Sequence, residues 1–143
     1  MEISSGVEKV LKEASKSMRS GYVDPQELRN LGMVMLSAAL MSGESYFFTL
    51  STALYTLADT LSSFLRVTSV PLSLEVRSRA EQLLEEVRSS VSQHLVQMAE
   101  AVVAGDRCKA MECASELLSI SHRVSSVAEN FKNIVALQPA EEE

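Results

Sequence analysis

Two long amphipathic stretches within residues 72–137, joined at Ala104-Gly105-Asp106, constrain the fold more than any other feature. Both carry an apolar stripe at intervals of three and four residues, the spacing typical of helices that pack lengthwise on other helices. The first stripe comprises Ala80, Leu84, Val87, Val91, His94, Met98 and Ala101. The second comprises Met111, Ala114, Leu117, Leu118, Ser121, Val124, Ala128, Phe131 and Val135. We predict a long C-terminal helical hairpin whose stripes face one another.

The residues of the central turn support this hairpin. Gly105 can adopt the left-handed conformation that ends a helix, and the Asp106 carboxylate can accept from the free N–H groups that open the next one. Such a turn specifies geometry and indicates no activity.

The rest of the sequence favours helices as well. Pro and Gly are scarce, Trp is absent, and no segment alternates β-branched residues with turn signals. A chain of 143 residues can bury one core without disulfides or metal. We therefore predict an all-α, antiparallel up-and-down bundle of four to five helices. Residues 1–138 form a single domain in this prediction, and residues 139–143 form a frayed acidic tail.

Start and stop signals divide the N-terminal part into two helices. Ser5 and Glu8 have the spacing of a capping box, and Gly21 predicts the end of this first helix. Asp24-Pro25-Gln26-Glu27 combines an N-cap acid with proline at the first helical position, which predicts a helix over 25–42.

A third helix is expected over about 44–69, because Pro71 separates it from the long hairpin. Gly32 lies inside the preceding helix, where glycine costs about 1 kcal/mol relative to alanine. We interpret it as a place of close helix contact.

Charge is almost missing from residues 31–74, where the charged side chains are Glu44, Asp59 and Arg66. Phe48 and Tyr55 are seven residues apart, in line on the back of the third helix. Uncharged helix surfaces tolerate burial in interfaces. Our leading hypothesis is a non-enzymatic interaction or scaffold protein that forms a homodimer or higher oligomer through its second and third helices.

The overall charge and the cysteines limit the other partners and the compartment. A net charge of −6 without basic clusters argues against DNA and anionic membranes. The apolar run 31–41 is shorter than the ~20 residues that span a bilayer. Cys108 and Cys113 are five residues apart on one expected helix, too far for a disulfide, which suits a reduced, cytoplasmic protein. The N-terminus shows no signal-peptide pattern.

A second hypothesis concerns Arg88 and His94. The run Arg88-Ser-Ser-Val-Ser-Gln-His94 resembles the R-x4-6-H pattern of HEPN ribonucleases, which are small all-α domains that act as metal-independent dimers. This resemblance implies that the arginine stabilises charge on a phosphate of RNA while the histidine handles a proton. The family commonly has Asn, Asp or His after the arginine, where this chain has Ser89. Because Arg88 and His94 point about 120° apart on a straight helix, they would serve one site only across a dimer.

Other chemistry has less support in the sequence. His122 lies opposite the apolar stripe and resembles the exposed histidine of phosphotransfer domains, but Ser125 and Ser126 replace the usual Lys and Gly. Neither histidine has a Glu three residues before it, so we expect no di-iron site. Cys108, Glu112 and Cys113 have no histidine at ligand spacing, so we expect no zinc site either. We expect no cofactor. A regulatory bundle that binds a ligand or a protein partner in the groove between the two long helices is a weaker alternative.

Overall fold

The computed structural model describes residues 2–20 and 23–137, which form five α-helices and no strand. The helices are α1 (Glu2–Ser20), α2 (Pro25–Ser42), α3 (Tyr46–Val67), α4 (Leu74–Ala104) and α5 (Arg107–Leu137). The predicted all-α fold with a long C-terminal hairpin is confirmed for this part of the chain. Gly21 and the acidic tail 139–143 lie outside the described residues.

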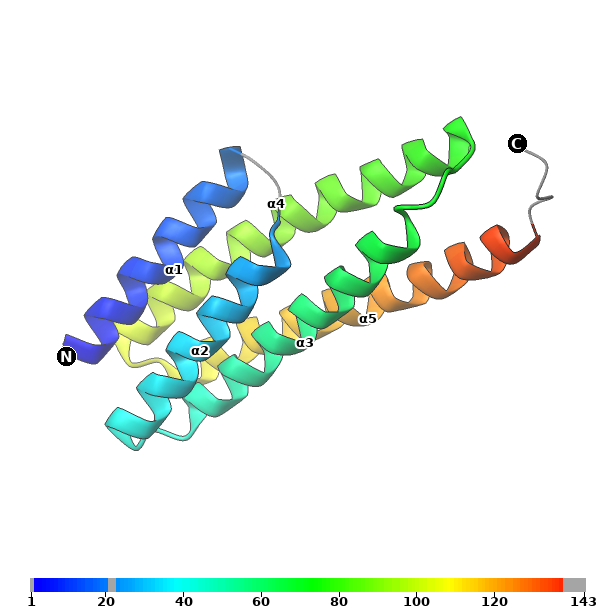
Figure 1. The fold of residues 1–143 in the computed structure, drawn as a ribbon. Coiled ribbons are helices and arrows are strands. Elements are labelled where there is room, and N and C mark those ends of the chain that lie inside the picture. The colour runs from blue at the N-terminus through cyan, green and yellow to red at the C-terminus, as the bar shows by residue number, and fades with distance from the viewer. Residues whose placement is uncertain (1, 21–22, 138–143) are drawn as a thin grey trace.

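The helices form a ring around one core, and each packs on two neighbours (Figure 1). Their order around the ring is α1, α2, α3, α5, α4 and back to α1. Consecutive helices run antiparallel, so α3 and α5, which are neighbours in space, run in the same direction. Two contacts between α3 and α5 agree with this parallel direction. Thr60 Oγ1 lies 2.7 Å from Ser121 Oγ, and further along both helices the rings of Phe64 and Phe131 have centroids 5.7 Å apart.

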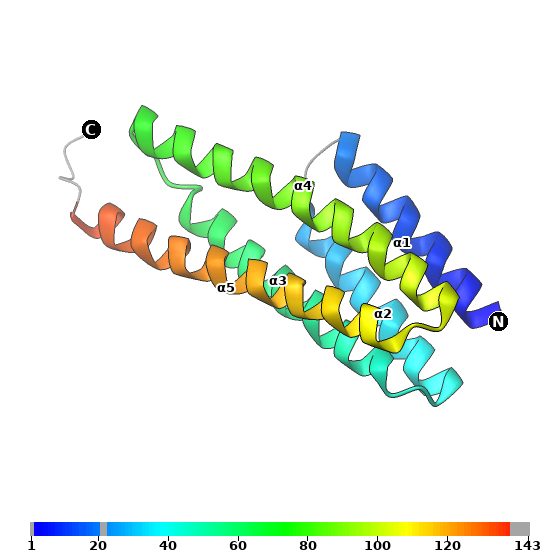
Figure 2. The same ribbon diagram turned by 180° about the vertical axis from the view of Figure 1, so that it is seen from behind.

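The core is apolar and is filled by all five helices. Its largest fully buried side chains are Phe47, Phe64, Leu11, Met18, Leu28, Met35, Leu50, Leu54, Leu57, Leu61, Leu95 and Met98. At 31 residues each, α4 and α5 are longer than the 19-residue α1 and the 18-residue α2. The beginning of α4 and the end of α5 therefore extend beyond α1 and α2, as both views show (Figures 1 and 2).

The two arms of the hairpin face each other less directly than their stripes predict. α4 packs more extensively on α1, and α5 more extensively on α3, than the arms pack on one another. The buried face of each arm is turned accordingly. In α4, Leu83 is buried and Leu84 is half-buried. In α5, Met111 and Leu118 remain 41% and 38% exposed while Ala110 and Cys113 are buried.

Most of the predicted helix ends are correct. α2 spans the predicted residues, and the Asp24 carboxylate accepts from the N–H of Gln26 at 3.0 Å. Gly105 closes α4 at φ 71°, and Asp106 accepts from the N–H of Lys109 at 3.0 Å.

The predicted capping box is wrong. α1 begins at Glu2, so Ser5 is an exposed residue inside its first turns. The physical reason is Ile3, which packs against the core one turn before Val7 and extends the helix in that direction.

Gly32 marks the close approach of α2 and α3, as predicted. A Cβ added at Gly32 would lie 3.1 Å from the ring of Tyr55, and the Ser51 hydroxyl donates to the Gly32 carbonyl at 2.9 Å. That hydrogen bond fixes the two backbones at this spacing. By contrast, a Cβ at Gly6 in α1 would meet nothing within 4 Å.

These two glycines form a matched pair for mutation. Gly32→Ala should lower the free energy of unfolding by about 1–2 kcal/mol, because the methyl group overpacks the contact with Tyr55. Gly6→Ala should instead raise it by up to ~1 kcal/mol through helix propensity. Urea denaturation of both variants measures the two effects. Equal stabilisation by both substitutions would contradict the close contact.

Candidate functional site

The outward face of α2 is the most unusual surface of the described residues. Its large apolar side chains are exposed by 57% at Met33, 37% at Leu36, 72% at Leu40 and 72% at Met41. They lie opposite the buried stripe that contains Leu28 and Met35, so α2 is apolar on both sides. A surface helix normally carries charged side chains on its outward face, but here the face is uncharged from position 30 to position 42.

The sequence predicted an interaction surface that includes Phe48 and Tyr55. In the structure these two side chains have different environments. Phe48 is 44% exposed. Tyr55 is half-buried, and its ring packs over Gly32. Tyr55 therefore supports the position of α2 within its own chain, while Phe48 contributes to the exposed apolar surface. The sequence analysis did not single out the four exposed residues of α2. The sequence pattern that could have found them is a second apolar stripe at positions 33, 36, 40 and 41.

Arg88 anchors the end of α1. Its Nη1 donates to the carbonyl oxygens of Met18 and Arg19 at 3.2 and 2.9 Å, and Glu85 holds the other side of the guanidinium. Carbonyls at a helix end lack partners within the helix, so this arginine satisfies two of them. Its side chain is 22% exposed.

His94 faces a different neighbour. It is half-buried in a hollow of about 340 Å³ between α4 and α5, beside Gln97 and Glu112. Its Nδ1 lies 2.8 Å from the Ser90 carbonyl oxygen and 3.5 Å from the Ser90 hydroxyl. Because a carbonyl only accepts, Nδ1 carries the proton in this bond and does not activate the hydroxyl.

The structure thus does not bring Arg88 and His94 together within one chain. Arg88 points to α1, and His94 points to the groove between α4 and α5. A ribonuclease site shared between two copies stays a prediction that no contact within this chain supports.

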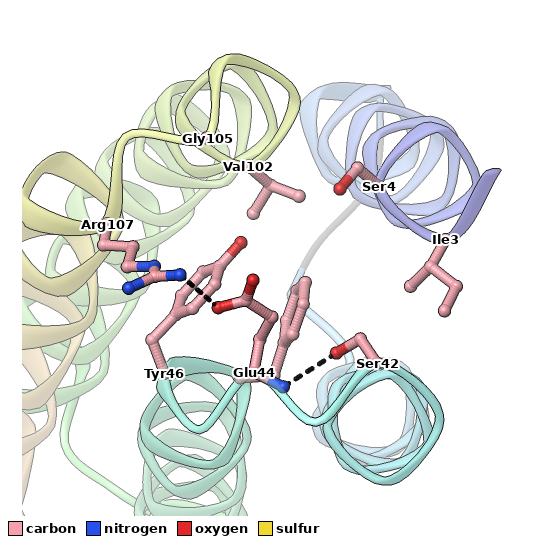
Figure 3. Close-up of a pocket in the computed structure, with 9 residues that line it drawn as sticks. Ile3, Ser4, Ser42, Glu44, Tyr46, Val102, Gly105 and Arg107 are labelled. Carbon is pink, nitrogen blue, oxygen red and sulfur yellow. Dashed lines mark hydrogen bonds and ion pairs between the residues drawn. The ribbon is translucent and has the colours of Figure 1, made fainter. Parts of the chain in front are cut away.

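A cavity of about 580 Å³ with a mixed polar and apolar lining lies at the end of the bundle where α1, α3 and α5 begin (Figure 3). The Glu44 carboxylate points into it and pairs with Arg107 at 2.8 Å. Tyr46 stands beside this pair, with its ring stacked on Phe47 at 4.4 Å. Burial, and then the Glu44 carboxylate, raises the pKa of Tyr46. The phenol therefore stays neutral, and the two charges of the cavity neutralise each other.

The remaining sequence candidates are isolated. His122 and Cys108 are exposed, while Cys113 is a buried core residue; both cysteines are free thiols. No three His, Cys, Asp or Glu side chains within the described ranges are close enough to hold a metal ion. A second hollow between α4 and α5, of about 470 Å³, is lined by residues such as Arg79, Glu86 and Phe131.

Comparison of the chain with protein-family models, with curated proteins and with solved structures gives no match. Within residues 2–20 and 23–137, the helices are also too short or too polar to cross a membrane.

Removing the donors of Arg88 should destabilise the end of α1. Arg88→Met keeps the length of the side chain but removes the donors of two hydrogen bonds, which should lower the free energy of unfolding by about 1–2 kcal/mol. The matched control is Arg79→Met, because Arg79 is 72% exposed and pairs with Glu75 across one helical turn. Its loss should stay below about 0.5 kcal/mol. Equal urea stability of the two variants would contradict the anchoring role.

The two cysteines should differ in reactivity. Burial raises the pKa of the Cys113 thiol, so less thiolate is present at a given pH, and the folded chain also blocks access. In the native protein, iodoacetamide should modify Cys108 at least about tenfold faster than Cys113. Intact mass over time measures both steps. Cys108→Ser should leave only the slow step, and a fast step in that variant would show that Cys113 is accessible.

Proposed function

We propose that this protein is an interaction or scaffold protein that self-associates through the outward face of α2 and the adjoining part of α3. The observation that carries the proposal is the exposed stripe of Met33, Leu36, Leu40 and Met41. Large exposed apolar patches on folded proteins mark interaction sites. Covering the exposed part of one such side chain contributes on the order of 1 kcal/mol.

The start of α3 extends this surface. Ser51 bonds to Gly32 across the antiparallel pair, so Phe48, one turn earlier in α3, is level with Leu36, one turn later in α2. Both side chains are exposed. The register therefore supports a continuous apolar area that includes both helices.

The few charges near this surface are already paired. Glu44 pairs with Arg107, and Asp59 accepts from Arg29 at 3.0 Å. The centres of protein interfaces are depleted of charged residues. Two copies of a chain with net charge −6 would repel one another least where the surface is neutral.

Leu40→Glu tests the proposal, because this side chain is 72% exposed and its replacement leaves the core intact. Burying a carboxylate in the interface should weaken self-association at least roughly 100-fold. The matched control is Leu74→Glu, at a leucine that is 84% exposed at the beginning of α4. Light scattering after size-exclusion chromatography should give an oligomer for the parent and the control, and a monomer for Leu40→Glu. A monomeric parent would refute self-association.

A further inference from the structure

The cavity at the end of the bundle combines apolar and charged side chains in one small space. Its apolar lining includes Phe47 and Val102. The side chains of Glu44, Tyr46 and Arg107 reach it from the α2–α3 turn, the beginning of α3 and the beginning of α5 (Figure 3). Its volume of about 580 Å³ falls within the roughly 300–1,000 Å³ of small-molecule sites, which pair apolar walls with a few polar groups. The cavity therefore suits a small molecule with an apolar part and a polar head.

Two tight turns hold the charged residues of the cavity in place. Gly43 closes α2 at φ 75°, and the N–H of Glu44 then donates to the Ser42 hydroxyl at 3.1 Å. Gly105 closes α4 at φ 71°, and Arg107 is the first residue of α5. Both charged residues thus lie within two residues of a helix end, so the packing of the bundle fixes the distance between their backbones.

The ion pair in the cavity uses only part of its bonding capacity. Arg107 Nη2 lies 2.8 Å from Glu44 Oε1. A guanidinium has five N–H donors and a carboxylate has two oxygens, so the pair can keep this contact and still bind a ligand. A ligand with one charge would be attracted by one member of the pair and repelled by the other. A ligand with an ammonium next to a carboxylate gives each member an opposite charge.

Tyr46 supplies a further hydrogen-bond donor. Burial, and then the Glu44 carboxylate, raises the pKa of its phenol, which therefore keeps its proton at neutral pH. A neutral phenol can donate to a ligand carboxylate. The ring is stacked on the buried Phe47, which restricts its orientation.

We propose that this cavity binds a free α-amino acid with an apolar side chain. The ligand ammonium donates to Glu44, the ligand carboxylate accepts from Arg107 and Tyr46, and the ligand side chain contacts Phe47 and Val102. Such a ligand carries no net charge, so the balance of charge in the cavity is preserved. The proposal is independent of self-association, because none of these residues belongs to the exposed stripe of α2.

Amide chemical shifts of the ¹⁵N-labelled protein test the class of ligand. L-Leucine or L-phenylalanine should cause saturable shifts at Tyr46, Val102 and Arg107, with a dissociation constant of about 1 mM or tighter. N-acetyl-leucine lacks the ammonium and leucinamide lacks the carboxylate, so each should bind at least roughly tenfold more weakly than leucine. The absence of a saturable shift with both amino acids would overturn the proposal, and so would equal affinity for leucine and either analogue.

Charge-removing variants test the site. Glu44→Gln and Arg107→Gln each remove one charge, and each should weaken the binding of leucine at least roughly tenfold. The matched control is Arg123→Gln, because Arg123 is 57% exposed and pairs with Glu86 on the neighbouring helix, outside the cavity. This control should bind leucine as the parent does. Equal affinity of all three variants would show that leucine binds elsewhere and would overturn the site.

Discussion

The parallel packing of α5 on α3 determines how the other helices are arranged. α5 contacts α3 on one side and α4 on the other, so α4 follows α3 in the chain without being its neighbour. The six residues 68–73 reach at most about 20 Å, which is enough to step past one helix in a ring with spacings of roughly 10 Å. The remaining side of α3 is then covered by α2, and the remaining side of α4 is covered by α1. The ring closes where α1 meets α2. This contact is sparse, and it leaves open an apolar groove of about 650 Å³ lined by Val7 and Val10 of α1 and by Val34 and Ala38 of α2.

Hydroxyl groups connect the helices at three of these contacts. Ser15 donates to the Ser92 carbonyl at 2.7 Å between α1 and α4, and Ser51 donates to Gly32 between α3 and α2. Ser121 bonds with Thr60 between α5 and α3. Small hydroxyl side chains let backbones approach closely while each buried oxygen keeps a partner. The serine content of the chain thus has a structural role at these positions.

Local signals made the helices predictable, whereas contacts distant in sequence were not. The caps at Asp24 and Gly105 act within a few residues, so the sequence alone places them. The role of Arg88 depends on carbonyls about 70 positions earlier, and a spacing pattern along one helix contains no such information. The face that α5 buries depends in the same way on α3, which explains the exposure of Met111 and Leu118. The uncharged segment indicated α2 and α3 as a surface but not which of their side chains are exposed. It led to Tyr55, whose ring packs over Gly32 within the chain, and not to the exposed Met33, Leu36, Leu40 and Met41.

The sparse contact between α1 and α2 has a consequence for the stability of α1. α1 is held mainly by α4 and by the anchor from Arg88, so it can separate without disrupting the α2–α3–α5 packing. We therefore expect its amide hydrogens to exchange through a local opening that requires less free energy than global unfolding. A molecule bound in the groove would contact both α1 and α2 and would therefore suppress this opening. Occupancy of the groove is thus linked to the protection of α1 against hydrogen exchange. The rate of hydrogen exchange in α1 would thus indicate whether the groove is occupied.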